Sequence, residues 1–336
     1  MNIKTAYVTG GTGCVGRNII NELLENGWRV IVAHRRSSNL SRLAGLDIEY
    51  REVDLYDDRS ALDSLPEGLD ALFHVAANTS HWPLEESQQW MDNVLATRNL
   101  ALAAVEKQVG RFILTSTGAT YPYRQCSRSE AARIESSYIR TKRLSEIEVE
   151  ECVTAGILNA VILRPIIVIG AYDYNSYSQI FTAIANQKLN GVFPGRIDFC
   201  HARDVAKAHV SAYEKGRAGE AYLLAGPNAS WLQLVQKIGQ RLGVQTLEKS
   251  TPLWQLFLLS YPALWISYLT RKKPMITPQL VRLLGTGLTP ASEFCKANKE
   301  LGYESSSLDD MINDCMEWME SEGMLPDFGM LKQNAD

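Results

Sequence analysis

A tyrosine and a lysine four residues apart form the most reactive pair that the sequence offers. They stand at the two ends of YIRTK, as Tyr138 and Lys142. On a helix, residues i and i+4 share a face, so the phenol and the ammonium would point into one small volume. A cation within about 4–6 Å favours the phenolate and lowers the pKa of the tyrosine, which suits a general acid or base near neutral pH. Hydroxyls at Thr115 and Thr117 end an apolar run, where they could hydrogen-bond a substrate oxygen beside Tyr138.

A glycine-rich turn near the N-terminus predicts a nucleotide-binding site. In TGGTGCVG, glycines at positions 10, 13 and 16 lie between an apolar run and a helical pattern. Glycines at this spacing allow a tight turn, a close approach of the backbone to a pyrophosphate, and close packing of helix against strand. The N-terminus of the helix adds N–H donors and a positive dipole end. We therefore expect a dinucleotide to contact Gly10, Thr12, Gly13, Cys14, Val15 and Gly16.

The end of the second expected strand bears on which dinucleotide binds. An acidic residue there would accept hydrogen bonds from the ribose 2′-hydroxyl of NAD, whereas a basic residue would suit the 2′-phosphate of NADP. The strand runs into Arg35 and Arg36 and has no carboxylate. The sequence therefore favours NADP(H), with NAD(H) as the alternative. Asp54 and Leu55, after the third expected strand, would contact the adenine, although Asp54 could also be a helix N-cap.

Short apolar runs alternate with helical patterns through the first half of the chain. This alternation predicts βαβ units, and hence an α/β fold with a doubly wound parallel (Rossmann) sheet. The pattern loosens after Gly170, where we expect a smaller, mainly helical C-terminal lobe that binds substrate. The expected domains are a dinucleotide-binding domain at 1–170, to which 199–225 returns, a substrate lobe at 171–198 and 226–330, and a tail at 331–336. The expected strands are 3–9, 29–34, 48–53, 71–75, 111–115, 160–163 and 221–224, and the expected helices are 15–26, 87–108, 138–154, 203–214, 230–242, 277–284 and 308–321.

One segment of the C-terminal lobe stands apart by its composition. Residues 252–269 read PLWQLFLLSYPALWISYL, which is apolar on all sides but contains Gln255, Ser260 and Ser267 and is broken by Pro262. A membrane-spanning helix needs about 20 apolar residues, so this segment is marginal by length and worse by content. We expect a buried helix pair or a lid over an apolar substrate. Weak contact of 252–273 with a membrane surface is the alternative.

Composition and spacing exclude several classes of function. The 336 residues carry a formal net charge of −4, so the chain has no basic excess for nucleic-acid binding. The six cysteines lie at least 20 residues apart and the five histidines form no HExxH cluster, so we expect no metal site. The N-terminus shows no signal-peptide pattern. We therefore expect a cytoplasmic protein with free thiols, a monomer or homodimer whose partner is a small-molecule substrate.

Several landmark sequences extend this interpretation from single motifs to most of the chain. In this order they resemble the extended short-chain dehydrogenase/reductase superfamily, also called the NAD-dependent epimerase/dehydratase family. The landmarks are TGGTGCVG at 9–16, VDL at 53–55, HVAA at 74–77, NVLATRNL at 93–100, TST at 115–117 with YIRTK, LRPIIVIG at 163–170 and HARDVAKAH at 201–209.

The resemblance implies a role for individual residues. Tyr138 would be the proton donor or acceptor, Thr117 the catalytic hydroxyl, and Lys142 would hold the nicotinamide ribose. Further cofactor contacts are implied at Ala76, Ala77, Asn93, Thr115, Arg164, Pro165, Ile166 and Ile167, and substrate contacts at Thr79, Trp82, Thr117 and Tyr172.

The residues that follow Thr117 bear on the reaction. Sugar-nucleotide 4,6-dehydratases of this superfamily carry Asp-Glu there, whereas this chain has Gly118-Ala119, so we do not expect elimination. Arg35 and the turn at 219–222 are more similar to the reductase branch, which includes dihydroflavonol 4-reductases and 3β-hydroxysteroid dehydrogenase-like proteins. We expect an NADP-dependent oxidoreductase that interconverts a ketone and a secondary alcohol on a bulky, largely apolar substrate. The alternatives are a nucleotide-sugar epimerase with tightly bound NAD and a non-catalytic nucleotide-binding regulator.

Overall fold

The computed structural model describes residues 3–285 and 294–325, and the chain divides into two compact units. The first unit contains the chain up to Ile166, the segment Arg203–Leu224, and the segment with helix α12 (Phe294–Leu301). The second unit contains the rest. Helix α12 lies in the sequence range expected for the substrate lobe. It packs instead on strand β9 (Ala221–Leu224) of the first unit.

The first unit is built on a seven-stranded sheet in the order β3-β2-β1-β4-β5-β6-β9. Every neighbouring pair of strands is parallel. The central strands are apolar and buried along their whole length, as expected where helices cover both faces of a sheet. The predicted doubly wound parallel sheet is confirmed. Its strands are β1 (Thr5–Thr9), β2 (Arg29–His34), β3 (Glu49–Glu52), β4 (Ala71–His74), β5 (Arg111–Thr115), β6 (Ala160–Pro165) and β9.

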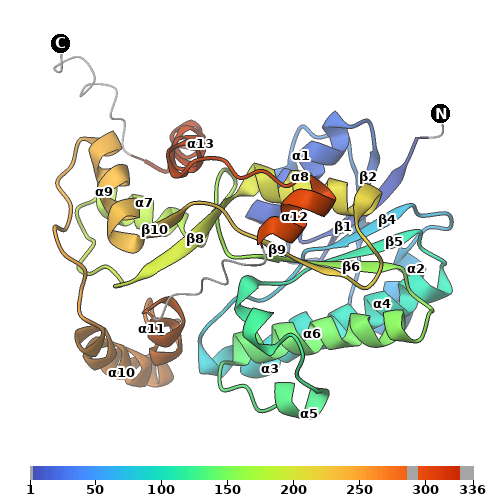
Figure 1. Ribbon diagram of the computed structural model, residues 1–336, viewed down its shortest axis with the longest axis horizontal. Helices are drawn as coiled ribbons and strands as arrows, with labels where there is room; N and C mark the ends of the chain where they lie inside the picture. Colours follow the sequence, from blue (N-terminus) through green and yellow to red (C-terminus); the bar gives the residue numbers. More distant parts are fainter. Residues whose placement is uncertain (1–2, 286–293, 326–336) are drawn as a thin grey trace. The chain divides into compact units, whose positions relative to one another are not determined.

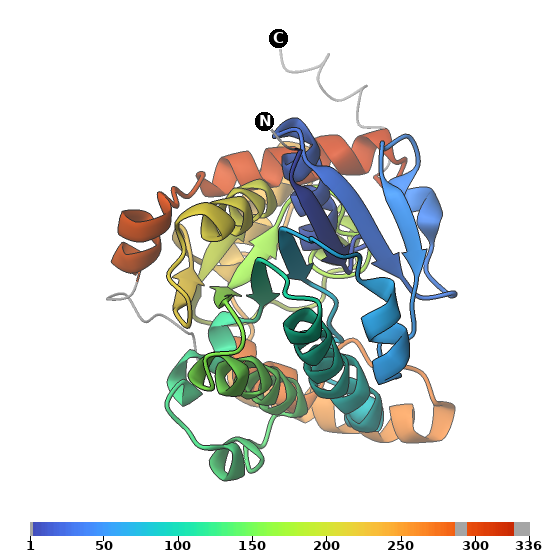
Figure 2. The ribbon, with the colours of Figure 1, turned by 90° about the vertical axis from the view of Figure 1, so that its right-hand side faces the viewer.

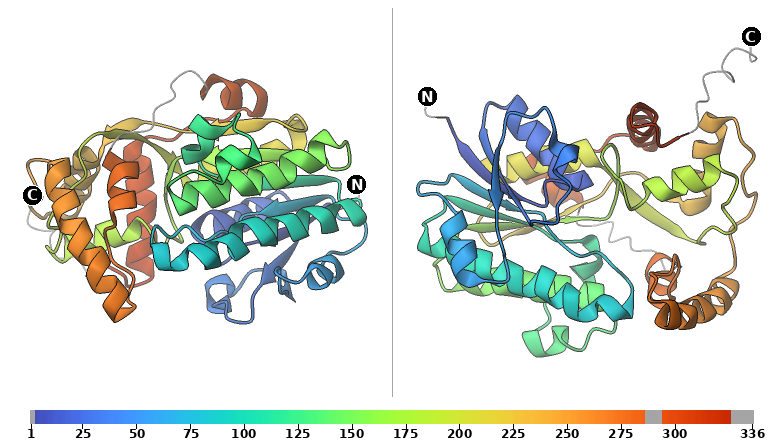
Figure 3. Two further views of the ribbon diagram at one scale, coloured as in Figure 1. Left: turned by 90° about the horizontal axis from the view of Figure 1, so that it is seen from below. Right: turned by 180° about the vertical axis from the view of Figure 1, so that it is seen from behind.

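Helices cover this sheet on both faces (Figure 1, Figure 2). Helices α4 and α6 run side by side along one face, as the view from below shows (Figure 3), while α1 and α8 cover the other. Apolar side chains of the sheet and of α4 and α6 form a continuous core, to which α6 contributes Val149 and Cys152. The helices of this unit are α1 (Cys14–Glu25), α2 (Asp58–Ser64), α3 (Glu86–Gln89), α4 (Ala96–Glu106), α5 (Arg128–Ala131), α6 (Ser137–Thr154), α8 (Ala202–Lys215) and α12, with short 3₁₀ helices η1 (Leu40–Leu43), η2 (Pro83–Glu85) and η4 (Gly118–Tyr123) and a π-helix η3 (Trp90–Leu95).

The second unit contains a three-stranded sheet in the order β10-β8-β7. Strand β7 (Ile167–Ile169) pairs in parallel with β8 (Arg196–His201), and β10 (Asn228–Ser230) pairs antiparallel with β8. This lobe is mainly helical, as expected, and the small sheet is an addition that the sequence patterns did not reveal. Its helices are α7 (Ser178–Ala185), α9 (Trp231–Leu242), α10 (Leu253–Thr270), α11 (Pro278–Gly285) and α13 (Leu308–Ser321).

Two expected elements differ from the observed ones. The single helix expected at 87–108 is α3, the π-turn η3 and α4 in succession, so the helical path is continuous but widened at Asn93. Pro262 does not break the segment 252–269, which is one helix, α10. A proline removes the hydrogen bond to the carbonyl four residues earlier, here that of Leu258. Because Leu258 and Pro262 lie on the exposed side, water can satisfy that carbonyl.

Candidate active site

The glycine turn between β1 and α1 can be built only with glycine at two positions. Gly10 has a φ of +72°, and a Cβ atom there would lie 2.6 Å from the Ala76 nitrogen. A Cβ atom at Gly16 would lie 2.2 Å from the carbonyl oxygen of Gly10, so the start of α1 rests directly on the turn. The Gly13 amide donates to the Gly10 carbonyl at 3.1 Å and closes the loop.

The N-terminus of α1 fits an anionic group. Its N-cap is Gly13, which has no side chain to cap the helix, and the first turn contains no acidic residue. The first-turn amides and the positive end of the helix dipole therefore suit a pyrophosphate. Thr12, Cys14 and Val15 are partly buried around this turn. This cradle fits the dinucleotide that the sequence predicts.

A chain of buried hydrogen bonds ties the glycine turn to the next strand. The Thr9 hydroxyl lies 2.8 Å from His74 Nδ1 and accepts hydrogen bonds from the amides of Val75 and Ala76, both at 3.1 Å. His74 Nε2 lies 2.9 Å from the Thr97 hydroxyl, which donates to the Asn93 carbonyl at 2.6 Å. Burial, with a smaller contribution from Lys142, lowers the pKa of His74 to about 3. The imidazole is therefore neutral and structural.

At the end of β2, Arg35 is paired with an acidic residue that the sequence did not single out. The exposed Arg35 guanidinium lies 3.2 Å from the Asp92 carboxylate. Asp92 also accepts hydrogen bonds from the Tyr56 hydroxyl and from the Asn78 side chain, the latter at 3.0 Å. Arg36 is exposed beside it. Both arginines thus follow the end of β2, where a 2′-phosphate is expected. Asp92 would compete with that phosphate for Arg35.

The expected adenine contacts lie on the same side of β1 as Arg35, after the end of β3. Asp54 is exposed, and its carboxylate accepts the amide of Tyr56 at 2.9 Å. The Leu55 carbonyl accepts a hydrogen bond from Asn99 at 3.0 Å. The N-cap of α2 is Asp57, whose side chain accepts the Ser60 amide, so the interpretation of Asp54 as the cap is wrong.

The Tyr138–Lys142 pair lies on α6, next to the carboxyl end of β5. Ser136 caps α6, so that Tyr138 falls in the first turn. The Thr117 side chain lies near enough to the Tyr138 phenol to lower its pKa. Lys142 is buried, and its ammonium donates to the Thr115 carbonyl at 2.8 Å. The three expected catalytic residues are therefore gathered at one strand end.

The pKa of Tyr138 is not lowered, contrary to what the pairing with Lys142 had led us to expect. Burial raises the pKa of Tyr138, and the nearby Thr117 side chain offsets this only in part. The expectation that Lys142 depresses this pKa is therefore not met in this structure. Burial lowers the pKa of Lys142 to about 8, although the nearby Glu146 carboxylate raises it. At pH 7 the pair consists of a neutral phenol and a protonated lysine.

Two histidines that the sequence analysis gave no role lie next to these groups. The edge of the His81 ring packs against Tyr138, with ring centroids 5.1 Å apart. His209 Nε2, on α8, lies 2.8 Å from the Thr115 hydroxyl, so this side chain is held by the protein. Burial lowers the pKa of His209 to about 4. Such contacts link residues 94 positions apart, which no local pattern can reveal.

Asn93 acts through its neighbours, since its amide is buried and fully engaged. Its Oδ1 accepts the Asn78 amide at 2.7 Å, and its Nδ2 donates to the Asn78 carbonyl and the Thr141 hydroxyl, both at 3.0 Å. It lies on the π-turn η3, and such turns occur frequently at functional sites. Asn93 therefore positions the loop after β4 against helix α6.

Arg164, another expected cofactor contact, is paired within the protein. Its guanidinium is buried and binds both oxygens of Glu146, at 2.8 and 2.9 Å. Glu146 lies one further turn along α6 from Lys142 and also pairs with Arg143 at 2.9 Å. Arg164 thus anchors α6 to β6. Pro165 ends β6, Ile166 is half-buried at the end of the first unit, and Ile167 opens β7 in the second unit.

The residues around the strand ends leave no room for a carboxylate after Thr117. A Cβ atom at Gly118 would lie 2.7 Å from the Ile166 side chain. Among the expected substrate contacts of the first unit, Thr79 is exposed and Trp82 is buried in the loop after β4. Tyr172 lies in the second unit with a φ of +69°, and its ring packs against Trp318. Ala76 is half-buried and Ala77 is exposed beside the glycine turn.

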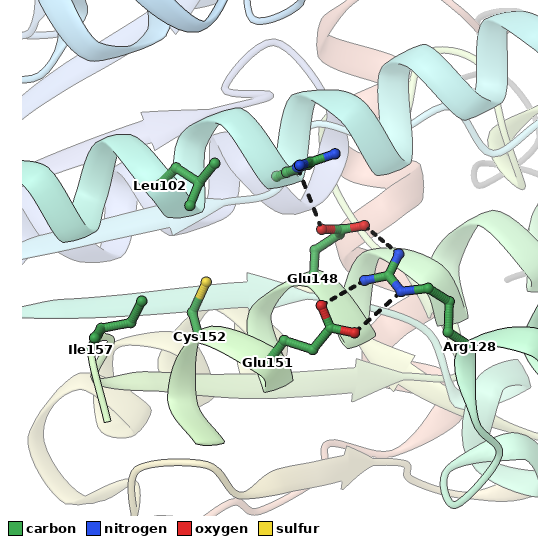
Figure 4. Close-up of a pocket in the computed structure, with 7 residues that line it drawn as sticks. Leu102, Arg128, Glu148, Glu151, Cys152 and Ile157 are labelled. Carbon is green, nitrogen blue, oxygen red and sulfur yellow. Dashed lines mark hydrogen bonds and ion pairs between the residues drawn. The ribbon is translucent and has the colours of Figure 1, made fainter. Parts of the chain in front are cut away.

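A hollow of about 430 Å³ lies elsewhere, beside the C-terminal half of α6. Arg128 lies between Glu148 and Glu151 there, at 2.6 and 2.8 Å (Figure 4). Burial raises the pKa of the Cys152 thiol in its wall. None of the expected site residues lines this hollow, so it is separate from the Tyr138 site. Within 3–285 and 294–325 no group of His, Cys, Asp and Glu side chains is arranged to hold a metal ion.

The parallel sheet, the glycine turn and the gathered Thr117, Tyr138 and Lys142 define a dinucleotide-dependent enzyme of the Rossmann class. The family model described as "NAD dependent epimerase/dehydratase family" matches residues 6–225. The chain belongs to this family, whose members are NAD(P)-dependent oxidoreductases and epimerases.

Comparisons over the full length support this assignment. The chain is 30% identical to sterol demethylase protein B of Methylococcus capsulatus, over 96% of this chain and all of that protein. It is 27% identical to a 4-hydroxy-2-methyl-3-oxo-4-farnesyl-3,4-dihydroquinoline-1-oxide ketoreductase of Stigmatella aurantiaca, over 88% of this chain and 91% of the relative. The crystal structure of gox2253 is similar with a TM-score of 0.81 and 28% identity, covering 97% of this chain and 100% of that one.

Proposed function

We propose that this protein is an NADP-dependent oxidoreductase that interconverts a ketone and a secondary alcohol on a bulky, largely apolar substrate. The observation that carries the proposal is the Tyr138 phenol beside Thr117, since burial raises the pKa of this phenol and keeps it protonated. A neutral phenol at a strand end is suited to donate a proton to an alkoxide. With Gly118 and Ala119 after Thr117, the site lacks the acidic pair that an elimination would need.

Each residue of the site has a distinct task in this reaction. A nicotinamide dinucleotide, when bound, supplies or accepts the hydride. Tyr138 transfers its proton to the substrate oxygen as that oxygen becomes an alkoxide. Thr117 hydrogen-bonds the same oxygen and orients it. Lys142, a cation at pH 7, would hold the nicotinamide ribose.

The preference for NADP(H) rests on the end of β2. The end of β2 itself carries no acidic residue that would accept hydrogen bonds from the ribose of NAD, and Arg35 places a cation there, paired with Asp92 of η3. The Arg35–Asp92 ion pair is largely exposed on the arginine side, and such surface pairs contribute only about 0–1 kcal/mol. Arg35 can therefore exchange Asp92 for a 2′-phosphate at little cost.

The apolar substrate is supported by the names of the relatives. One is a sterol demethylase protein, another a ketoreductase whose substrate carries a farnesyl group. A third is a 2-alkyl-3-oxoalkanoate reductase of Stenotrophomonas maltophilia. Each of these names indicates a substrate with an apolar skeleton, the reduction of a ketone, or both.

A nucleotide-sugar epimerase is the second candidate, because the family includes such enzymes and they need only a tyrosine, a lysine and tightly held NAD. It is less favoured because Arg35 replaces the acidic residue that NAD requires. A non-catalytic regulator is less favoured still, since Thr117, Tyr138 and Lys142 are all present and in place.

Cofactor titration followed by a turnover screen distinguishes these functions. The purified protein should bind NADPH more tightly than NADH and oxidise NADPH stoichiometrically with an apolar ketone such as a steroid or a 3-oxoalkanoate. An epimerase would instead retain NAD through purification and interconvert nucleotide sugars without net consumption of cofactor. Binding of NADPH with no turnover of any ketone or alcohol would favour the regulator.

A further inference from the structure

Helix α10 in the second unit buries two serines and exposes large apolar side chains, the opposite of an ordinary surface helix. Its inward side is formed by Leu256, Ser260 and Ser267, all buried. The Ser260 hydroxyl donates to the Phe257 carbonyl at 2.9 Å, and the Ser267 hydroxyl donates to the Leu264 carbonyl at 2.6 Å. The buried hydroxyls are thus satisfied within the helix, so α10 needs no polar partner to pack on its unit.

The opposite side of α10 carries large apolar side chains. Trp254, Leu258, Tyr261, Trp265 and Leu269 follow one another at spacings of four, three, four and four residues, which places them on one stripe. Their exposed fractions lie between 50% and 80%. Single exposed apolar residues are ordinary, but an uninterrupted stripe along a helix about 27 Å long marks an interaction surface.

The helix is held firmly enough to present this stripe. At its start, the Thr251 amide donates to the Val192 carbonyl at 2.8 Å, and the Val192 amide donates to the Thr251 hydroxyl at 3.1 Å. Along its length α10 packs on α11, beside which it lies in Figure 1 and Figure 3. The contact is close, since a Cβ atom at Gly285 would lie 2.3 Å from the Leu253 side chain.

The charge around the stripe is of one sign. Residues 249–292 contain Lys249, Arg271, Lys272, Lys273 and Arg282, and not one Asp or Glu. The rest of the chain has 29 basic and 38 acidic residues, a net charge of −9. Arg271, Lys272 and Lys273 are exposed directly after the apolar helix. A cationic end on an apolar, Trp- and Tyr-containing stripe is complementary to an anionic lipid surface.

We propose that α10 and Arg271–Lys273 form a membrane-docking surface that binds the face of an anionic phospholipid bilayer. The helix lies in the plane of the interface, with Trp254, Leu258, Tyr261, Trp265 and Leu269 inserted among the headgroups and upper acyl chains. The three basic residues contact anionic headgroups. Among the described helices none is long and apolar enough to cross a bilayer, so the contact is peripheral.

A second copy of the chain is a poorer occupant of the same surface. A twofold dimer through α10 pairs the same surface of each copy, and residues 249–292 contain no acidic residue that could neutralise Arg271–Lys273 of the other copy. An anionic bilayer supplies the opposite charge and also buries the apolar stripe. The proposal does not depend on the proposed enzymatic function, because docking requires no turnover.

Co-sedimentation with vesicles tests the proposal on the full-length protein. The probes are phosphatidylcholine vesicles with and without about 30% phosphatidylglycerol. We expect binding to the anionic vesicles at low salt, with a marked loss at about 1 M salt, where charges are screened. A wild-type protein that stays in the supernatant with anionic vesicles at low salt would overturn the proposal.

Two variants separate the contributions of charge and apolar surface. Arg271→Glu with Lys272→Glu and Lys273→Glu should weaken binding to anionic vesicles roughly 100-fold, since each basic residue contributes about 1 kcal/mol near such a surface. The matched control is Arg133→Glu with Lys188→Glu and Lys207→Glu, all exposed and outside the segment. It makes the same change in net charge and should bind as the wild type.

Trp265→Ser with Leu269→Ser should weaken binding at least about tenfold while leaving thermal unfolding unchanged, because both side chains are exposed. Leu102→Ser with Ile157→Ser removes two similarly exposed apolar side chains from the first unit and serves as its control. Wild-type vesicle binding by the Trp265→Ser/Leu269→Ser variant or by the Arg271–Lys273 variant would overturn the proposal. It would also fail if the α10 variant abolished a dimer in analytical ultracentrifugation without changing vesicle binding.

Discussion

At the scale of single residues, the proposed preference for NADP(H) can be tested at Arg35 and Asp92. Arg35→Ala should raise the Kd for NADPH roughly 10- to 150-fold, the effect of a charge-assisted contact of about 1.5–3 kcal/mol. It should change the Kd for NADH little, because NADH has no phosphate to lose. Fluorescence titration with both cofactors measures the two effects. Equal losses for NADPH and NADH would mean that Arg35 has only a structural role.

Substitution of Asp92 should change the affinity for NADPH in the opposite direction. Its carboxylate lies 3.2 Å from the Arg35 guanidinium and carries the charge that a phosphate must replace. Asp92→Asn keeps the shape of the side chain but removes that charge, so we expect tighter binding of NADPH and a larger ratio of NADH to NADPH dissociation constants. A weaker affinity for NADPH in this variant, measured by the same titration, would contradict the proposed place of the phosphate.

At the scale of elements, the β1–α1 turn can be tested with a matched pair of glycines. Gly10 and Gly27 both have positive φ angles, +72° and +74°, but only Gly10 would place a Cβ atom against backbone, 2.6 Å from the Ala76 nitrogen. Gly27→Ala should cost about 1 kcal/mol in the free energy of unfolding. Gly10→Ala should cost about 1–3 kcal/mol more and abolish dinucleotide binding. Urea unfolding and NADPH titration measure both quantities, and equal behaviour of the two variants would refute this account of the turn.

The elements also show where local sequence patterns stop being informative. The glycine turn and the Tyr138–Lys142 helix were predictable because short-range spacing alone sets them. The π-turn at Asn93 was not, since it depends on hydrogen bonds to Asn78 and Thr141. Strand β8 was missed because a six-residue strand gives too little periodic signal. The reversed polarity of α10 could be recognised only from which of its sides is buried.

At the scale of the whole molecule, two buried histidines make stability depend on pH. His74 and His209 have pKa values near 3 and 4, against 6.5 when exposed. Between pH 6.5 and about 4, the unfolded chain therefore binds protons that the folded chain does not, and the free energy of unfolding falls as pH falls. Each histidine contributes up to about 1.4 kcal/mol per pH unit in that window.

Substitution of one histidine isolates this effect. His209→Gln should reduce the slope of unfolding free energy against pH by up to about 1.4 kcal/mol per unit, measured by urea denaturation at pH 7, 6 and 5. Identical slopes for the variant and the wild type would show that His209 titrates normally in the folded protein.

The long-range contacts of the molecule are the part that the sequence could not supply. The order of strands and helices indicates the parallel sheet, and the sheet brings Thr117 and Tyr138 together. The partners of Arg164 and Thr115 were not predictable, because Glu146 and His209 reach them only after the chain has packed. These buried partners make Arg164 an anchor of α6.

The proton transfer assigned to Tyr138 is tested most directly by its phenylalanine variant. Tyr138→Phe removes one hydroxyl and keeps the ring against His81. It should lower kcat for ketone reduction at least about 10²-fold, while the Kd for NADPH stays within about twofold of the wild type. Tyr123→Phe, at an exposed position, should have no effect on either quantity. Ketone reduction by Tyr138→Phe at the wild-type rate would contradict the assignment of Tyr138 as the proton donor.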